Sequence, residues 1–353
     1  MDIDYRSFRE DSDWQSVQSL LAQVPMSSGF PLASQRTSTY SRSFPKLEGT
    51  ANDYIAHNGK TVLGYLHSTV SERRISQQKI QMAYLGDGRM HPDFRRHGIA
   101  SKTLQATLAD LRGRNIELGY FLVLDNNETI FRFFERQGFP MRKVTSYVAT
   151  SLFVFARPHH KSSGAFEEFT PKTDDFTDLI SEWSQQQFAP TISVDELEDF
   201  FWAYPEIRVF RERTSQKWAF ALWNQESFRR LAFTKNNRLL RTVRPFWNLL
   251  AAFGLASRFP AVGQTWSSLE VVFTTRRMFH PELKSFLVQE GRRQNMHTVN
   301  LIESGLSQES LPSKHWAEYK MKLGYYLFTP QKEFPTWLSD KLNPPYYLDL
   351  GFV

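Results

Sequence analysis

The sequence contains no cysteine among its 353 residues. Disulfide bonds, thiolate metal sites and a cysteine nucleophile are therefore excluded. The sequence also lacks an apolar run of membrane-spanning length, and its first residues, Met-Asp-Ile-Asp-Tyr-Arg, have no basic stretch followed by an apolar core. We therefore expect a soluble cytoplasmic protein without a membrane span.

Acidic residues are fewer than basic ones, 37 against 43, which gives a net charge of +6. The whole excess lies before residue 162, where 21 Lys and Arg stand against 15 Asp and Glu. Such a field favours a polyanionic ligand. Nucleic acid is not the expected partner, because the sequence has no nucleic-acid motif and no long basic tail. The length and the hydrophobic content of 41% favour two domains with separate cores.

A glycine turn is the most informative motif. It follows a strand expected over residues 80–90 and opens an amphipathic helix. The first backbone N–H groups of a helix lack intrahelical acceptors, and the helix dipole adds positive potential there. Glycine and alanine also leave the backbone accessible to a ligand. The turn therefore predicts an anion site formed by Arg95, Arg96, His97, Gly98, Ile99, Ala100 and Ser101.

These residues resemble the motifs of the GNAT acyltransferases, which use acyl-coenzyme A. The family's loop of Arg or Gln, two residues, Gly, one residue, and Gly or Ala fits Arg95 to Ala100. Its strand that ends in an apolar residue, any residue and Pro fits Met90 to Pro92. Its later Asn and Gly-Phe pair, at the two ends of a helix, fit Asn127 and Gly138-Phe139. The resemblance covers residues 1–157.

The resemblance implies an α/β fold with a mixed sheet, an acyl-CoA cosubstrate and no metal. The activity it implies is N-acyl transfer by direct attack of an amine on the thioester, with acetyl-CoA as the simplest donor. By the same resemblance, Arg89, Met90, Asn127 and Phe134 join the loop in contacting the cosubstrate. Many family members have a tyrosine at the position of Phe134 to protonate the departing sulfur. A thiol with a pKa of about 8.5 leaves as thiolate without an obligatory proton donor.

Two polar residues are candidates for the catalytic base. Asp87 is the only carboxylate between Gln78 and His91, on the strand expected to face the substrate cleft. Flanking Gly86 and Gly88 leave a structural alternative, a bulge or bend in the strand, which is also common beside active sites. Tyr84 is the second candidate, and its spacing of three residues from Asp87 places it on the other face of the strand.

The second half of the chain repeats features of the first. Asp13-Trp14 is echoed by Asp175-Phe176, and Gly138-Phe139 by Gly324-Tyr325. The strand end at Met90-His91-Pro92 is echoed by residues 278–281, but no glycine follows before Gly291. We therefore predict two tandem GNAT-like domains, at 1–157 and 165–353, joined by a linker at 158–164. The second copy is expected to bind coenzyme A poorly and to serve as scaffold and acceptor-site wall.

An insertion of basic and aromatic character is expected near residues 235–264. It carries Arg238, Arg241 and Arg244, which suit an acidic partner or a membrane surface. The favoured alternative is that its aromatic residues, among them Phe246, Trp247 and Phe253, pack between the two domains. Upstream, a helix is expected over residues 32–43.

Three functions fit this pattern. The first is an acyl-CoA-dependent N-acyltransferase with one active site per chain. The second is a non-catalytic acyl-CoA-binding or regulatory protein, suggested by Phe134 and the degenerate second copy. The third is an acyltransferase that takes its acyl chain from a carrier protein docked on the basic insertion. The acceptor, the acyl length and the oligomeric state have no signature in the sequence.

Overall fold

The structure is a computed structural model. It describes residues 2–24, 32–36, 47, 49–76, 78–154, 164–234, 238–278, 282–303, 318–338, 342 and 346. The predicted linker lies outside this part of the chain, apart from Gly164. Residues 279–281, which echo the strand end of the first half, also lie outside it.

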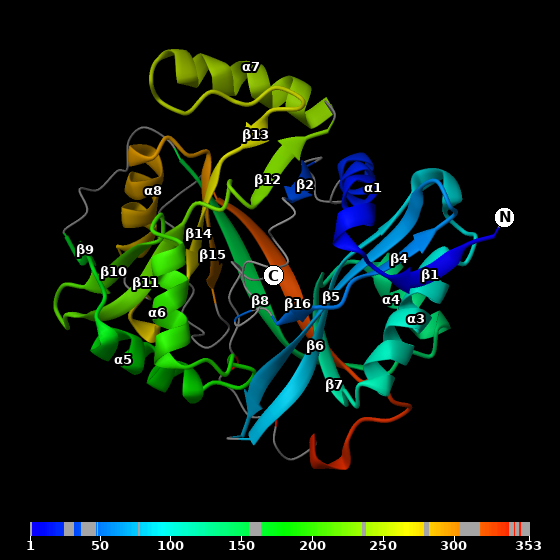
Figure 1. The fold of residues 1–353 in the computed structure, drawn as a ribbon. Helices are drawn as coiled ribbons and strands as arrows, with labels where there is room; N and C mark the ends of the chain where they lie inside the picture. The colour runs from blue at the N-terminus through cyan, green and yellow to red at the C-terminus, as the bar shows by residue number, and fades with distance from the viewer. Residues whose placement is uncertain are drawn as a thin grey trace.

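The first half of the chain alternates strands and helices (Figure 1). Its elements are β1 (Asp4–Ser7), α1 (Glu10–Gln23), β2 (Leu32–Arg36), β3 (Thr50–Ala51), β4 (Tyr54–His57), β5 (Val62–Ile75), β6 (Gln78–Met90), the short 3-10 helix η1 (Pro92–Phe94), α3 (Ile99–Gly113), β7 (Leu118–Leu124), α4 (Glu128–Arg136) and β8 (Met141–Phe153). The helices expected after the glycine turn and at Asn127 are therefore present as α3 and α4.

The second half follows a similar sequence of elements. They are β9 (Phe166–Phe169), α5 (Thr173–Ser184), α6 (Val194–Ala203), β10 (Arg208–Glu212), β11 (Lys217–Trp223), β12 (Arg229–Phe233), α7 (Arg238–Ala252), β13 (Thr265–Trp266), β14 (Ser268–Val272), η2 (Arg276–Met278), α8 (Leu283–Arg293), β15 (Thr298–Glu303), β16 (Glu318–Phe328) and η3 (Thr336–Leu338). The segment from β12 to β13 lies between β11 and β14 and has no counterpart between β5 and β6.

One mixed sheet of 13 strands runs through the described part of the molecule. Its order is β1-β4-β5-β6-β7-β16-β8-β15-β14-β11-β10-β9, with β3 paired to β5. Exchanging β1 with β9, β4 with β10, β5 with β11, β6 with β14, β7 with β15 and β8 with β16 reproduces the same order in reverse. The sheet is thus pseudosymmetric, which confirms the expected mixed α/β fold with a duplicated architecture.

The last strand of each half lies inside the other half's part of the sheet. β16 lies between β7 and β8, and β8 lies between β16 and β15. Their long antiparallel ladder pairs Glu318 with Leu152 at one end and Phe328 with Met141 at the other. Figure 1 shows β8 and β16 side by side at the centre, between the helices of the two halves. Only β6 with β7 and β14 with β15 pair in parallel in this sheet.

The α3 helix forms because its apolar residues recur on one face, where Ile99, Leu104, Leu108 and Leu111 are buried. The α4 helix begins at Asn127, whose side chain accepts a hydrogen bond from the Ile130 backbone N–H at 3.4 Å. It ends before Gly138, whose φ of 58° suits a glycine after a helix. These two helices hold the glycine turn and Asn127 at fixed places beside β6 and β7.

A small second sheet joins the two halves away from the main one. Its order is β13-β12-β2, and Leu32 of β2 is paired with Phe233 of β12. The helix expected over residues 32–43 is therefore wrong for residues 32–36, because pairing with β12 overrides their local preference. Residues 37–43 lie outside the described part of the chain.

The α7 helix packs only one face on the molecule. Trp247 is buried against Phe153, Phe259 and Trp266. Phe246 and Phe253, in contrast, are 62% and 72% exposed. The expectation that the insertion's aromatic residues pack between domains therefore holds for Trp247 and is wrong for Phe246 and Phe253.

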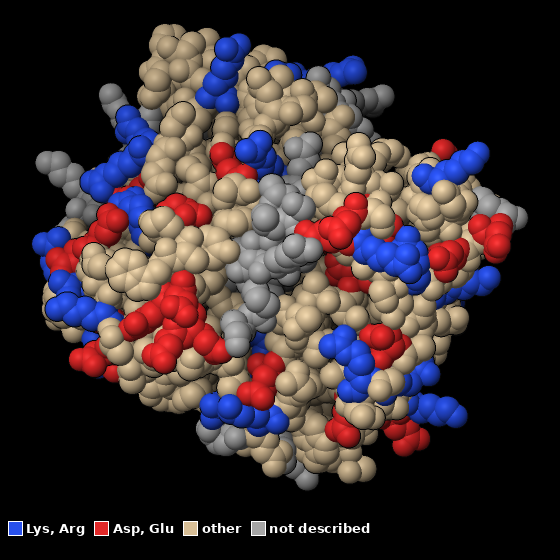
Figure 2. Space-filling view, viewed as in Figure 1, with Lys and Arg blue, Asp and Glu red and all other residues tan. Residues whose placement is uncertain are grey.

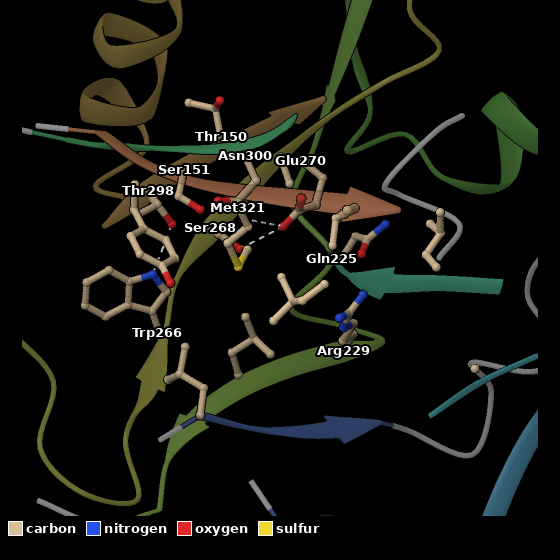
Figure 3. Close-up of a pocket in the computed structure, with 18 of the residues that line it drawn as sticks. Thr150, Ser151, Gln225, Arg229, Trp266, Ser268, Glu270, Thr298, Asn300 and Met321 are labelled. Carbon is tan, nitrogen blue, oxygen red and sulfur yellow. Dashed lines mark hydrogen bonds between the residues drawn. The ribbon is translucent and has the colours of Figure 1, made fainter. Parts of the chain in front are cut away.

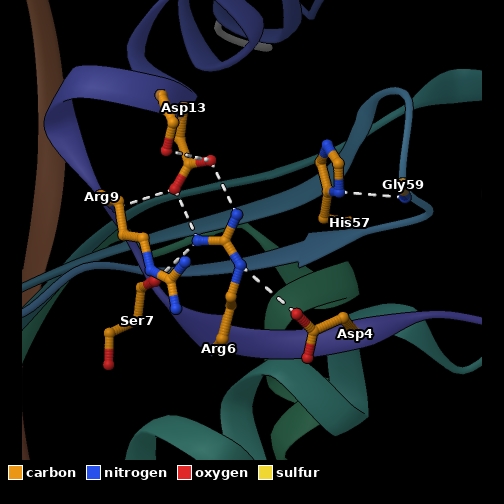
Figure 4. A network of polar contacts seen from close by, with 8 residues as sticks. Asp4, Arg6, Ser7, Arg9, Asp13, His57 and Gly59 are labelled. Carbon is orange, nitrogen blue, oxygen red and sulfur yellow. Dashed lines mark hydrogen bonds and ion pairs between the residues drawn. The ribbon is translucent and has the colours of Figure 1, made fainter.

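An aspartate fixes the first helix of each half. Asp13 accepts two hydrogen bonds from the Arg6 guanidinium, at 2.6 and 2.8 Å, and one from the Arg9 backbone N–H at 2.7 Å (Figure 4). Asp175 likewise accepts from the Lys172 backbone N–H at 2.8 Å, at the start of α5. Both contacts satisfy a helix N-terminal donor. The repeated Asp-aromatic pair of the sequence thus has a repeated structural role.

A second buried carboxylate, Asp53, immediately precedes β4 and faces β5. Asp53 accepts hydrogen bonds from the Tyr65 hydroxyl at 2.7 Å and the Ser68 backbone N–H at 3.1 Å, and its Oδ1 lies 2.7 Å from His67 Nδ1. Burial alone raises the pKa of the Asp53 carboxyl, but the facing His67 and these hydrogen bonds outweigh it and lower the pKa below its usual value. The charged form of Asp53 therefore stabilises the fold.

We predict that Asp53→Asn destabilises the protein by about 3 kcal/mol at pH 7, because it leaves a buried network without its charge. Urea unfolding measures the loss. A group with a lowered folded pKa stabilises above its unfolded pKa and loses that contribution as the pH falls, so the difference between the proteins shrinks in acid. Exposed Asp93→Asn is the control. A loss below about 1 kcal/mol contradicts the structural role.

Candidate active site

The two parallel strands of the first half separate beside Asp87. β6 and β7 pair from Met82 with Leu118 to Leu85 with Phe121, and both strands then continue without pairing to each other. At the same level, β6 bulges away from β5. Tyr65 pairs with Arg89 and His67 with Gly86, so the single residue Leu66 faces two residues, Asp87 and Gly88. The structure therefore confirms the bulge that Gly86 and Gly88 indicate in the sequence.

Asp87 occupies the bulge in an unusual backbone conformation. Its φ is 45°, and its Oδ1 lies 3.1 Å from a guanidinium nitrogen of Arg89. A Cβ at Gly86 would lie 2.6 Å from the Tyr84 hydroxyl, so a larger residue there would displace the Tyr84 ring. The bulge also changes the alternation of the strand, so Tyr84 and Asp87 line the same cavity. The prediction that they lie on opposite faces is therefore wrong.

A cavity of about 430 Å³ begins where β6 and β7 separate and runs over several neighbouring strands of the sheet. Its lining comes from both halves of the chain and from the small sheet that covers it. The residues are Leu32, Tyr84, Gly86, Asp87, Arg89, Leu122, Val123, Leu124, Asn127, Ala149, Thr150, Ser151, Phe153, Gln225, Glu226, Arg229, Leu231, Phe233, Trp266, Ser268, Glu270, Thr298, Asn300, Tyr319, Met321 and Leu323. Among the predicted site residues it brings together Tyr84, Asp87, Arg89 and Asn127.

The predicted anion loop lies at the start of α3, away from this lining. Arg96 and Gly98 have φ values of 67° and 74°, and the first α3 hydrogen bond is donated by the Lys102 N–H to the Gly98 carbonyl. The N–H groups of Ile99, Ala100 and Ser101 therefore precede the intrahelical ladder. Arg95, Arg96 and His97 are exposed, and a Cβ at Gly98 would meet no atom within 4 Å. The loop is thus open to an anionic ligand.

Two of the residues predicted to contact the cosubstrate are partly or fully buried. Met90 packs beside Ile99, and a Cβ at Gly64 would lie 2.8 Å from its methyl group. Phe134 is buried, with ring centroids 5.0 Å from Phe121 and 4.8 Å from Phe139. Neither residue lines the cavity. A role toward acyl-CoA stays a prediction for both, as it does for the loop.

The second half has different chemistry at the start of its corresponding helix. Glu282 precedes α8 where Gly98 precedes α3, and the second helical residue is Lys284 rather than Ala100. Lys284 is buried, and its ammonium lies 3.1 Å from Glu303 and 2.9 Å from Glu318. A paired charged side chain therefore stands where the first half has a methyl group.

Glu270 is the functional candidate that sequence reasoning missed. It lies on β14, opposite Asn300 in the parallel pairing with β15. Its Oε1 accepts from Asn300 Nδ2 at 2.8 Å and from Ser268 Oγ at 3.0 Å, and Figure 3 shows the carboxylate among the labelled cavity residues. Burial raises the pKa of Glu270 above its usual value, against the lowering effects of Asn300, Arg229 and Ser268. No motif surrounds it in the sequence.

The comparisons with known proteins agree with this architecture. Residues 23–139 match the sequence profile of the acetyltransferase (GNAT) family. This part of the chain is similar in sequence to the GNAT family. No curated protein sequence matches the chain. The family supports acyl-CoA-dependent N-acyl transfer as the general chemistry of the GNAT half.

Two solved structures resemble nearly the whole chain. N-myristoyltransferase of Saccharomyces cerevisiae with bound myristoyl-CoA aligns with a TM-score of 0.58 and 10% identity, over 93% of this chain and 79% of that one. A GCN5-related N-acetyltransferase from Sphaerobacter thermophilus aligns with a TM-score of 0.56 and 13% identity, over 93% and 96% of the two chains. At these identities the likeness establishes the fold, and it includes the second half.

Two absences hold for the described residues. None of their helices has the length and apolar character needed to cross a membrane. Within the same residues, His, Asp and Glu side chains do not gather in a group of three that could hold a metal ion. The cytoplasmic location and the lack of a metal stay predictions.

Glu270→Gln should stabilise the folded protein increasingly as the pH rises. A raised folded pKa means that wild type loses stability as the pH climbs through it, whereas glutamine stays neutral and still accepts from Asn300 and Ser268. The gain is about 1.4 kcal/mol for each pH unit by which the pKa is raised. Thermal unfolding between pH 5 and 8 measures it, with exposed Glu135→Gln as the control. A gain that is independent of pH contradicts the raised pKa.

Proposed function

We propose that the protein is an acyl-CoA-dependent N-acyltransferase with one acyl-CoA site, in the GNAT half, and that acetyl-CoA is its simplest donor. The observation that carries this proposal is the cavity that begins where β6 and β7 separate. An acyl group lying between the separated strands would meet an acceptor held in that cavity. The cavity is formed by both halves, so the second half serves as acceptor-site wall.

Coenzyme A suits the residues at the start of α3. Its phosphates would meet Arg95, Arg96 and the N–H groups that precede the α3 ladder, where the helix dipole is positive. The net positive charge of the first half favours the same polyanion. In the second half, Glu282 and buried Lys284 replace the small residues of the loop, which supports a single site.

The chemistry is attack of a neutral amine on the thioester carbonyl. A C–N bond forms, the C–S bond breaks, and coenzyme A departs as a thiolate. The ammonium formed on the acceptor nitrogen gives one proton to Asp87, directly or through a water molecule. Arg89 holds the Asp87 carboxylate at 3.1 Å and so positions it in the bulge. The buried ring of Phe134 supplies no proton, which a thiolate leaving group does not require.

Binding of acyl-CoA at the loop is tested by calorimetry with acetyl-CoA, longer acyl-CoAs and free CoA. Wild type should bind one equivalent, and the double variant Arg96→Glu, Gly98→Glu should bind at least 100-fold more weakly, because two carboxylates face the phosphates. Exposed Arg112→Glu, at the other end of α3, makes a similar charge change and should bind normally. Two equivalents per chain would place a second site in the other half.

Catalysis by Asp87 is tested by Asp87→Asn, with thiol release as the assay. We expect kcat to fall by about 10²–10⁴-fold, the usual contribution of a general base, while acyl-CoA binding is retained. Exposed Asp93→Asn is the matched control on the same side of the loop. An unchanged kcat would remove Asp87 from the mechanism. Binding of acyl-CoA without thiol release to any amine would favour the non-catalytic alternative.

A further inference from the structure

The Glu270 carboxylate lies on β14, in the part of the cavity that the second half forms. Its Oε1 is fixed by Asn300 and Ser268, and none of the described residues donates a hydrogen bond to its Oε2. Glu270 lines the cavity, and the side chains around it come from β8, β12, β14, β15 and β16. Arg229 offsets part of the carboxylate's charge, but Glu226 and Glu270 together outnumber it among the lining residues of the second half, which favours a bound cation.

The place of Glu270 in the sheet sets the length of a ligand that reaches it. Asp87 lies on β6, one strand beyond β7, and β7 is separated from β14 by β16, β8 and β15. The four strand spacings of about 4.8 Å from β7 to β14 alone amount to roughly 19 Å along the sheet. An acceptor with its reacting amine beside Asp87 and a second group at Glu270 is therefore long and extended.

The wall between the two ends is largely apolar. Ala149, Met321 and Leu323 lie on the sheet, and Leu231 and Phe233 lie on the covering strand β12. The charged residues of the lining are Asp87 and Arg89 in the first half and Glu226, Arg229 and Glu270 in the second. Methylene groups suit the middle, and charged groups suit the ends.

We propose that Glu270 Oε2 binds a cationic group of the acyl acceptor, so that the substrate is an amine with a second ammonium or guanidinium group at the far end of an apolar chain. This inference rests on the proposed function, because it assigns the acceptor of that site. The second half of the chain then selects the acceptor, whereas the GNAT half binds the donor.

Calorimetry with 1,10-diaminodecane and 1-aminodecane, in the presence of saturating free CoA, tests the proposal without turnover. Wild type should bind the diamine at least 10-fold more tightly than the monoamine, and Glu270→Gln should abolish this preference. Glu135→Gln, an exposed carboxylate on α4, should keep it. Equal binding of both amines, binding of neither, or a preference retained in Glu270→Gln overturns the proposal.

Failure of the inference and failure of the proposed function give different results. If acetyl-CoA binds and amines release thiol, but without the diamine preference, only the acceptor assignment is wrong. If the diamine binds through Glu270 and no thiol is released, only the proposed activity is wrong.

The outer face of α7 exposes large apolar side chains, which support a second, independent inference. Phe246, Leu249 and Phe253 recur at helical spacing and are 62%, 55% and 72% exposed. Five of the seven large apolar side chains that are exposed in the described structure lie within residues 246–262. The sequence from residue 235 to 264 contains five Lys or Arg and no Asp or Glu. Figure 2 shows tan and blue surface over α7, without red.

We infer that α7 docks on an anionic lipid surface. A helix with large apolar side chains outward and basic residues around them lies in a bilayer interface, where the apolar groups enter the acyl boundary and the cations meet the headgroups. Arg241 is exposed next to the apolar residues and supplies such a cation. An acidic protein surface is the less favoured partner, because it offers no apolar layer for two phenylalanines.

Vesicle flotation tests this docking, with pure phosphatidylcholine compared with vesicles containing 30% phosphatidylglycerol. The protein should float with the anionic vesicles only, and the triple variant Phe246→Ser, Leu249→Ser, Phe253→Ser should lose at least 10-fold in bound fraction. Trp202→Ser, at a side chain that is 80% exposed on α6, is the control and should float normally. Absence of flotation, or equal flotation of the triple variant, overturns the inference and leaves an acidic protein as the alternative partner.

Discussion

The pairing of β8 with β16 is the constraint on which the molecule depends. Each of these strands closes the part of the sheet that belongs to the other half, so neither half has a complete sheet alone. Separating the halves would expose a long double ladder of backbone groups that have no other partners in the sheet. The cavity lies over this seam, with Ala149 on β8 and Met321 on β16 in its wall. Its width is therefore fixed by backbone hydrogen bonds rather than by a flexible domain interface.

A symmetric frame with asymmetric side chains lets one half bind a ligand that the other half excludes. The parallel pairs β6–β7 and β14–β15 occupy equivalent places, and each is linked by a helix, α3 or α8. Gly98 and Ala100 leave the start of α3 open, whereas Lys284 is buried in α8 with Glu303 and Glu318. Loss of one anion site costs the fold little, because an internal ion pair replaces it. The second half can then contribute to the acceptor cavity.

The local motifs of the fold could be predicted from the sequence, but the pairings between strands far apart in the chain could not. Asn127 and Gly138 cap α4 as expected, and Gly86 and Gly88 flank the bulge, because such roles depend on near neighbours. The strand at Leu32–Arg36 was missed because its pairing partner lies about 200 residues away, in β12. Glu270 was missed for the same reason. Its significance comes from Asn300 and from a cavity whose other end is formed by β6 and β7.

The separation of charges along the cavity explains how one molecule could be both held and acylated. An amine must lose a proton before it attacks a thioester, but a protonated amine binds a carboxylate most tightly. If the same molecule carries two amines, the one at Glu270 stays charged, because Glu226 and Glu270 outnumber Arg229 in that part of the lining. The one at the acyl end lies beside the Asp87–Arg89 pair, whose net charge is zero, so it loses a proton to solvent more readily and attacks as the neutral amine. The roughly 19 Å between β7 and β14 keeps these two requirements apart.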